Sequence, residues 1–595
     1  VSNLSRAYRV NLTVLALVAL FTGAFLVFSI LSLSVARRLP QLALLGVLGL
    51  GARARLALVL AESALLGLLG SALGLALGTG LAWLALRLLG GDLGGAYFPG
   101  VQPTLQFSAL AAAVYGGLGV AVAVAGGWLP ARLAQRIAPA QALKGLGLAD
   151  AHRSPAWVGP VLIALGLALT QAPPIDEIPL AAYLSVALLL LGGIACVPAG
   201  VGLMLRALPP SRHAPTLLAV ERARHQRHTA TIAVAGVVAS LALSVALTVM
   251  VASFRDAVTR WLDTVLPADL YARGSAGSAA SETVFLPPAL VEAVRRVPGV
   301  ARVDTSRVAS VELDPAQPAV ALIARPVGED GGSLPLLGEP VPAEAGRTSV
   351  WISEPMASRY RLEPGSHFEL PLPDGRVVPA LARGVWRDYA RQHGALQLDA
   401  ADFERLSGDT RVNDLALWLA PGADGAQVQA AIRAQAGESV PLDFASPGEI
   451  RAISLRIFDR SFAVTYWLQG VAIAIGLFGI AASFSAQVLA RRKEFGLLSH
   501  LGLTRRQVLG IVAGEGAVWT LAGVALGLGL GIAVSAVLVK VVNPQSFHWT
   551  MDLLLPWARL ALLCAAMAAA GTLTAWLSGR AAAGRDAALA VKEDW

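Results

Sequence analysis

Two segments of this sequence carry the same charged residues, leucines and glycines at the same intervals. The segment that starts at Ala36 aligns, after one single-residue gap, with the segment that starts at Ala490. Both place paired arginines ahead of leucines, a glycine, further arginine and one glutamate. Coincident charge, glycine and spacing indicate an internal repeat. The aligned positions are Leu44 and Leu45 with Leu497 and Leu498, Gly49 with Gly502, Arg53 with Arg506, Glu62 with Glu515, and Gly70, Gly74 and Gly78 with Gly523, Gly527 and Gly531.

The chemistry open to these residues is electrostatic and does not make or break bonds. The sequence holds no G-x-x-x-x-G-K-[ST], so it has no phosphate-binding loop with which to hydrolyse ATP. It also lacks the G-x-S-x-G of serine hydrolases. His225 and His228 have no further Cys, His or acidic ligands nearby, which favours a basic segment over a metal site. We expect no catalytic residue, cofactor site or metal site in this chain.

The elements that position the repeats are predicted to be membrane helices. Of 595 residues, 55% are hydrophobic and only 14% are charged, against about 25% charged in soluble proteins. A bilayer core of about 30 Å needs about 20 helical residues. Nine runs nearly free of charge are candidates: 10–35, 56–87, 105–129, 156–172, 179–205, 229–253, 461–489, 508–539 and 557–578.

The charges divide the chain and orient it. Residues 255–460 hold 27 of the 39 acidic and 21 of the 47 basic side chains, which leaves this stretch at −6 and the remainder at +14. Short clusters of arginine between apolar runs do not form the basic face that nucleic acid requires. Because lysine and arginine stay on the cytoplasmic side, we expect an external start, a cytoplasmic C-terminus and an external domain over 255–460.

The spacing predicts a modular chain. Segments 36–56 and 490–507 are expected to be short amphipathic helices at the cytoplasmic surface, where they could contact a partner protein or anionic lipid. The predicted order is a first three-helix unit over 1–150, two linking helices and a basic segment over 151–228, a membrane helix over 229–254, the external domain over 255–460 and a second three-helix unit over 461–595.

The external domain is predicted to mix helices and strands. Residues 287–297 and 425–437 have helical patterns, 318–327 has a strand pattern, and 367–382 reads as a hairpin that turns at Asp374 and Gly375. Its aromatic residues are expected mainly in the core or packed at a subunit boundary, with contact to a ligand as the alternative. They are Trp351, Tyr360, Trp386 and Tyr389.

These motifs resemble the FtsX-like permease family of ABC transporters, which includes MacB and the lipoprotein-release permeases. The resemblance rests on "ARR…LL..LG…RR…..E" in both repeats, on the tails from Ala131 and Gly579, and on "ADLYAR", "VPGVARVD" and "GVWRDYARQHGAL" in the external domain. It implies a polytopic α-helical membrane protein of about nine transmembrane helices, with two FtsX-like repeats and a mixed α+β extracytoplasmic domain. Family members with two units have an additional first helix and first external domain, which we expect this chain to lack.

The resemblance also implies roles for the repeated residues. The two segments would seat on a dimeric ABC ATPase subunit that holds the ATP and Mg. Glu62 and Glu515 would either transmit its motion or form static ion pairs, and the glycines would pack helices or let them slide. The implied coupling residues are Arg37, Arg38, Leu44, Leu45, Gly49 and Arg53 in the first copy and Arg491, Arg492, Leu497, Leu498, Gly502, Arg505 and Arg506 in the second.

The implied function is that of a permease subunit in the bacterial inner membrane. Its partner's ATP hydrolysis would drive export or extraction of a lipoprotein, lipid or peptide at the periplasmic side. The expected contacts are the ATPase, membrane lipids and a periplasmic adaptor or cargo. A regulator that activates a cell-envelope hydrolase or sensor without transport is the alternative. An ion-coupled transporter is disfavoured, because both repeats share one topology and no charge sits at the middle of a membrane helix.

Overall fold

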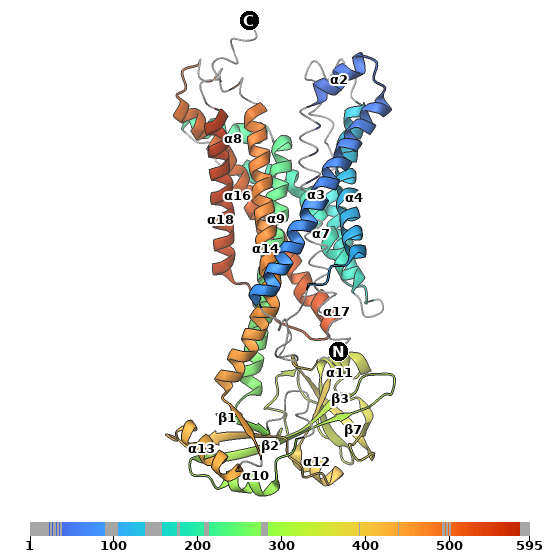
Figure 1. Ribbon diagram of the computed structural model, residues 1–595, viewed down its shortest axis with the longest axis vertical. Coiled ribbons are helices and arrows are strands. Elements are labelled where there is room, and N and C mark those ends of the chain that lie inside the picture. Colours follow the sequence, from blue (N-terminus) through green and yellow to red (C-terminus); the bar gives the residue numbers. More distant parts are fainter. Residues whose placement is uncertain are drawn as a thin grey trace.

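The computed structural model describes most of the chain as a tall helical bundle joined end to end with a β-rich domain (Figure 1). The described residues are 38–89, 105–136, 157–174, 179–207, 213–225, 227–274, 284–391, 393–437, 440–490 and 501–582, together with Gly23, Val27, Leu31, Val35, Glu494 and Leu498.

Six helices in the described ranges are long and apolar enough to cross a membrane. They are α3 (Ala52–Leu89), α4 (Ala109–Arg136), α7 (Leu180–Ala207), α9 (Arg227–Val265), α16 (Arg505–Val537), which continues through the π-helical turn η1 (Leu538–Val542) into α17 (Asn543–Phe547), and α18 (Trp557–Ala582).

Three of the nine predicted runs are not among these six helices of the described residues. Most of the 10–35 run lies outside the described residues. The 156–172 run forms only α6 (Val158–Leu169). The 461–489 run lies inside α14 (Pro447–Ala490), in which Thr465–Phe478 is the apolar stretch found among the described residues. The structure thus supports a multi-pass membrane protein, while the count of nine stays a prediction.

Helix α9 is the centre of the bundle, because 94% of its most apolar window is buried by the surrounding helices. Glycines of α16 allow the two backbones to approach closely. A Cβ atom at Gly523, Gly527 or Gly531 would come within 3.0, 3.2 and 2.6 Å of α9 side-chain atoms. These three glycines therefore pack helices, which is one of the two roles expected for them.

The matching glycines of the first repeat behave differently. A Cβ atom at Gly70, Gly74 or Gly78 of α3 would meet no described atom within 4 Å. Helix α3 packs against α4 through other small residues, such as Gly67, where a Cβ would lie 2.7 Å from the Ala123 side chain. The predicted packing role therefore applies to the second glycine series and not to the first within the described structure.

The domain at the far end of the bundle, which we call the sheet domain, contains a ten-stranded mixed sheet in the order β10-β1-β9-β2-β3-β8-β5-β7-β4, with β6 paired to β7. The strands are β1 (Leu270–Gly274), β2 (Val300–Val311), β3 (Val320–Ala324), β4 (Leu336–Leu337), β5 (Thr348–Ser353), β6 (His367–Pro371), β7 (Val377–Trp386), β8 (Ala395–Leu398), β9 (Asp414–Leu419) and β10 (Leu442–Ala445).

Short helices cover this sheet in two places. Helices α10 (Pro288–Arg295) and α13 (Gly425–Ala436) pack on β1 and β9, while α11 (Glu354–Tyr360) and α12 (Ala400–Ser407) cover the part around β3, β5 and β8. The two predicted helices, the strand and the hairpin turning at Asp374 and Gly375 are all present. Trp351 and Trp386 lie in the core, as the first of the two expectations for the aromatics states.

Two helices connect the bundle to the sheet domain without interruption. α9 continues past residue 254 to Val265, directly before β1, and α14 starts at Pro447, directly after β10. The predicted boundaries at 255 and 460 therefore fall inside continuous helices. We call the segments 254–265 and 447–462 the stalk; Figure 1 shows both running side by side from the bundle into the sheet domain.

The glycine packing gives a paired prediction. Alanine is about 1 kcal/mol better than glycine inside a helix, so Gly78→Ala should leave the thermal unfolding midpoint unchanged or raise it. Gly531→Ala should lower the midpoint, because its methyl group would lie 2.6 Å from Val245 Cβ and 2.8 Å from the Ala242 carbonyl oxygen. Equal shifts for the two variants in detergent would contradict the close packing of α16 on α9.

Candidate functional site

The two predicted coupling segments have the same local geometry at the end of the bundle away from the sheet domain (Figure 1). In the first copy, α2 (Leu39–Val47) ends at Gly49, which has φ +100°. In the second copy, Gly502 has φ +94°. The backbone N–H of Leu50 donates to the Leu45 carbonyl at 2.9 Å, and that of Leu503 donates to the Leu498 carbonyl at 3.1 Å.

These bonds are the left-handed helix ending that glycine adopts without strain. The repeated glycine is thereby explained as the residue that turns the chain from the coupling segment into α3 or α16. α16 begins with a capping box, in which Thr504 and Gln507 exchange hydrogen bonds between side chain and backbone.

Corresponding leucines of the two copies have corresponding environments. Leu45 packs against the base of α3, and Leu498 packs against Val508 and Val512 of α16. Leu48 and Leu501 occupy equivalent positions and are 75% and 69% exposed. Leu44 is exposed as well, at 52%. In each copy, one leucine therefore packs against the helix that follows the segment, and another leucine is exposed.

The two glutamates have different surroundings. Arg38 Nη1 donates to Glu62 Oε1 at 2.6 Å, so a coupling-segment arginine and the acid of α3 form the ion pair that both expected roles require. Both side chains remain half-exposed. Glu515 is 5% exposed in α16. The equivalence in sequence does not extend to burial.

Burial of Glu515 follows from α8 (Ala214–His225), which packs along the start of α16. A Cβ atom at Gly514 would lie 3.4 Å from the Ala219 methyl group. Arg222 of α8 also forms an ion pair with Glu494, which belongs to the second coupling segment. Helix α8 of the linking region thus contacts both α16 and the coupling segment of the second repeat. The charge and hydropathy of 213–225 suggested only a basic segment.

Several predicted coupling residues can be placed only in part. Arg53, Arg505 and Arg506 lie in the first turns of α3 and α16, where their side chains are largely exposed. Arg37, Arg491, Arg492 and Leu497 lie outside the described residues. Their assignment to an ATPase contact stays a prediction, as does that of the other coupling residues.

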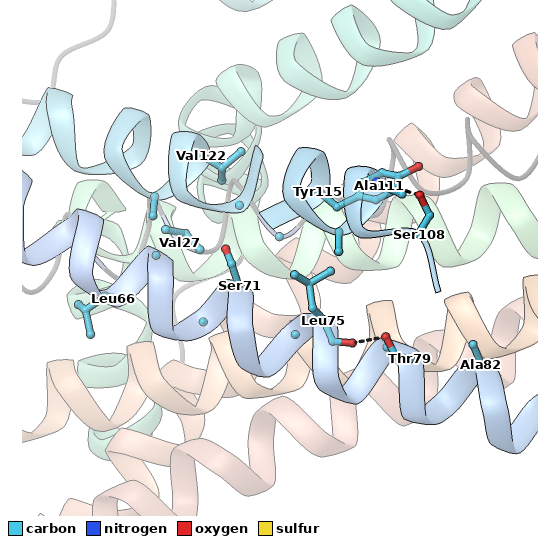
Figure 2. Close-up of a pocket in the computed structure, with 18 of the residues that line it drawn as sticks. Val27, Leu66, Ser71, Leu75, Thr79, Ala82, Ser108, Ala111, Tyr115 and Val122 are labelled. Carbon is cyan, nitrogen blue, oxygen red and sulfur yellow. Dashed lines mark hydrogen bonds between the residues drawn. The ribbon is translucent and has the colours of Figure 1, made fainter. Parts of the chain in front are cut away.

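The open face of α3 borders an apolar cavity of about 940 Å³ between α3 and α4. Figure 2 shows Leu75 and Tyr115 reaching into this space from the two helices. Its hydroxyl groups make local hydrogen bonds: Thr79 donates to the Leu75 carbonyl at 2.7 Å, and Ser108 accepts from the Ala111 N–H at 3.3 Å. Among the described residues, the glycine face of α3 therefore borders a cavity, whereas the same face of α16 is covered by α9.

The stalk is held together by charge pairs between its helices. Arg255 of α9 lies 3.3 Å from Asp459 of α14, and Asp263 pairs with Arg451 closer to the sheet domain. Further into the bundle, Gln469 Nε2 donates to Thr248 Oγ1 at 2.7 Å. Salt bridges at exposed positions contribute little to stability, so their main effect here is to fix the register of two helices.

The sheet domain also contacts the loop between α17 and α18, residues 548–556, which we call the junction loop. Thr550 donates its backbone N–H and its hydroxyl to the Glu354 carboxylate, the latter at 2.6 Å. Tyr389 donates its hydroxyl to the Thr550 carbonyl at 2.8 Å. Asp552 accepts from Arg387 of the sheet domain and from Arg260 of the stalk, both at 3.3 Å.

Aromatic rings fill the space among the stalk, the sheet domain and the junction loop. Trp549 stacks on Phe254 of the stalk with centroids 5.7 Å apart, and Tyr389 meets both rings edge-on. Burial raises the pKa of Tyr389 to about 12. Tyr389 therefore lies where the sheet domain meets the stalk and the junction loop, a contact that the sequence did not predict.

A conservative pair of substitutions tests this junction. Tyr389→Phe should lower the unfolding free energy by about 1 kcal/mol through loss of one hydrogen bond, with faster hydrogen exchange in the junction loop. Tyr360→Phe is the control, because the Tyr360 hydroxyl is buried without a hydrogen-bond partner in the described structure and its removal should be neutral or stabilising.

The pH dependence of the same contact has a definite sign. The pKa of Tyr389 is about 12 in the folded protein and about 10 in the unfolded chain. Its contribution to the unfolding free energy is therefore fully present below pH 10 and is lost as the pH rises toward 12. The difference in unfolding free energy between wild type and Tyr389→Phe should therefore be constant from pH 7 to 9. A difference that vanishes within that range would contradict the junction geometry.

Comparison with known proteins agrees with the repeat. A sequence model described as FtsX-like permease C-terminal matches residues 13–139 and again residues 468–587. A curated relative, an uncharacterized ABC transporter permease protein of Mycobacterium tuberculosis, is 29% identical over 612 residues, which covers 98% of this chain and 70% of the relative.

Two solved extracytoplasmic domains are also similar. The periplasmic region of MacB from Actinobacillus actinomycetemcomitans is 10% identical, with a TM-score of 0.25 over 33% of this chain and 95% of that one. The extracellular domain of the noncanonic ABC-type transporter YknZ from Gram-positive bacteria is 14% identical, with a TM-score of 0.21 over 30% of this chain and 99% of that one.

The family match covers both copies of the repeat separately, and the coupling geometry at Gly49 and Gly502 is common to them. Both repeats of this chain therefore match the FtsX-like permease family, and the chain as a whole is similar to a permease of the ABC transporters.

Proposed function

We propose that this chain is the transmembrane subunit that couples ATP hydrolysis by a separate ATPase dimer to work on a substrate outside the bacterial inner membrane. The observation that carries the proposal is the continuity of α9 and α14, which run from the bundle into the sheet domain without a break. In this arrangement the coupling segments face the cytoplasm and the sheet domain lies in the periplasm.

The exposed leucines support the cytoplasmic half of the proposal. Leu44, Leu48 and Leu501 are apolar side chains at the tips of the bundle, and exposed apolar side chains near charged ones are typical of protein contact surfaces. An ATPase subunit, with ATP and Mg bound to it, would cover them. Two equivalent segments suit the two subunits of an ATPase dimer.

The stalk and the junction loop support the part of the proposal that concerns the periplasmic side. Movement of α16 at the coupling end would reach α9 through their close glycine contact, and would reach the sheet domain through the stalk and the junction loop. The substrate would be a lipoprotein, lipid or peptide that is extracted or exported at the periplasmic side, with a periplasmic adaptor or the cargo itself contacting the sheet domain.

Affinity purification from native membrane is the direct test of the partner. We expect a small ABC ATPase to co-purify in a ratio that fits a dimer, and its ATP hydrolysis to depend on the presence of this chain in reconstituted vesicles. Absence of any ATPase, with no effect of ATP on the reconstituted protein, would contradict the proposal.

The Arg38–Glu62 pair gives a sharper test of coupling. An exposed pair contributes at most about 1 kcal/mol to stability, so Glu62→Arg should change the unfolding midpoint little. If the pair transmits force, the same variant should reduce stimulation of the ATPase several-fold, and the double exchange Arg38→Glu with Glu62→Arg should restore it.

The matched control is Arg405→Glu, which breaks an exposed pair with Asp402 on the sheet domain, far from the coupling segments. It should leave ATPase stimulation unchanged. If ATPase stimulation instead falls in every variant in proportion to the amount of folded protein, the Arg38–Glu62 pair has only a static role.

A further inference from the structure

The sheet domain encloses a second cavity, of about 510 Å³, which the proposed function does not use. Its floor is the face of β1, β9 and β2 opposite to the core under α10 and α13. One side is formed by the stalk, through Val265, Leu266 and Ile450. Small-molecule sites have volumes of roughly 300 to 1,000 Å³, so the space is large enough for a ligand.

The floor carries an ordered row of polar side chains. Arg273 on β1 lies opposite Asp414 on β9, at 3.8 Å between charged atoms. Arg302 on β2 lies over the Trp418 ring at 4.5 Å and is held by two hydrogen bonds to Asp304. Each of these arginines therefore already has a carboxylate partner.

Arg325 is different, because it brings a positive charge to the other side of the cavity that shares its nearest carboxylate with a second arginine. Its backbone is fixed by hydrogen bonds to Leu398 and Ala400, directly after β3. Its Nε is buried without a hydrogen-bond partner in the described structure, and the neighbouring Asp388 carboxylate, which attracts it electrostatically, is paired with Arg391. Burial and the neighbouring Arg391 guanidinium both lower its pKa.

Arg391 is the second cation on this side. It pairs with Asp388 at 3.2 Å, and Asp388 is completely buried and also accepts from the Ala390 N–H. One carboxylate therefore serves two neighbouring guanidinium groups. Like charges placed together in a partly dry cavity are unfavourable unless an anion joins them.

Two further buried groups that line the cavity have unused hydrogen-bonding capacity. Gln397 is 2% exposed and its Oε1 has no partner in the described structure; Trp386 is 1% exposed and its Nε1 likewise has none. Tyr271 accepts a hydrogen bond from the Ala268 N–H at 3.1 Å, which leaves its own hydroxyl proton free to donate. Buried polar groups without partners are uncommon in native proteins.

We propose that this cavity binds a small ligand that carries an oxyanion, either a carboxylate or a phosphate, with Arg325 and Arg391 holding the anion. Guanidinium groups match both oxyanions through paired N–H donors. Gln397 supplies an acceptor for an N–H or O–H of the same ligand, and Leu266 and Trp418 border its apolar part.

The position of the cavity gives such a ligand a mechanical consequence. Val265 and Ile450 belong to the last turn of α9 and the first turn of α14, so an occupied cavity fills the angle between the stalk and the sheet. Occupancy would stiffen this connection. The site is independent of the ATPase, and its test needs no partner protein.

The test uses the purified full-length protein and two probes, inorganic phosphate and N-acetylalanine, each titrated while the thermal unfolding midpoint is measured. At least one probe should raise the midpoint in a saturable manner, and the probe that does so identifies the oxyanion. Arg325→Met should weaken that probe's binding by at least about tenfold. In the absence of any probe it should keep or raise the midpoint, because it removes a buried charge that shares its nearest carboxylate with Arg391.

The control variant is Arg376→Gln, an exposed arginine on the hairpin between β6 and β7, which should bind the probe like wild type. Arg391→Gln provides a second cavity variant if Arg325→Met does not fold. The proposal is overturned if neither probe shifts the wild-type midpoint in a saturable manner. It is overturned equally if the shift persists in the cavity variants at the strength seen in Arg376→Gln, since the anions would then act on the protein as a whole.

Discussion

The structure depends on the unbroken backbone hydrogen bonding of two helices. α9 has 39 residues and α14 has 44, which at 1.5 Å per residue makes them about 58 and 66 Å long. A bilayer core is only about 30 Å thick. The excess length carries the sheet domain away from the membrane on a pair of stiff helices, and any tilt of the bundle must therefore displace the sheet domain.

The two repeats keep one local geometry and differ in what surrounds it. Gly49 and Gly502 end their coupling segments in the same left-handed turn, and Leu48 and Leu501 are exposed alike. Beyond that turn, α9 and α8 cover the second unit, whereas the glycine face of α3 borders a cavity. Force that enters the second unit therefore has a packed route to the stalk through α9.

Sequence patterns predicted the features that are local. The repeat with its aligned glycines, the hairpin at Asp374 and Gly375 and the family resemblance were all visible in residue types and spacing, whereas the turn at Gly49 and Gly502 was not predicted. The stalk was missed because hydropathy falls where Arg255, Asp256 and Arg260 begin, although the helix continues.

Those sequence patterns did not predict contacts between segments that are far apart in the chain. Glu354 and Thr550 are 196 residues apart, and nothing in either stretch of sequence indicates that they meet. The cavity around Arg325 is likewise assembled from several strands and both stalk helices. An isolated arginine after a strand reads as an ordinary surface residue until the fold shows that its Nε is buried.

Rigidity of the stalk is the claim on which the rest depends, and spin-label distances test it directly in the reconstituted complex with its ATPase. One label pair, at Ile453 and Phe478, spans 25 residues of α14, or about 37 Å. A second pair joins Glu292 of the sheet domain to Leu73 of α3. On addition of ATP, the first distance should stay constant while the second changes. A change within α14, or two constant distances during ATP hydrolysis, would contradict the account.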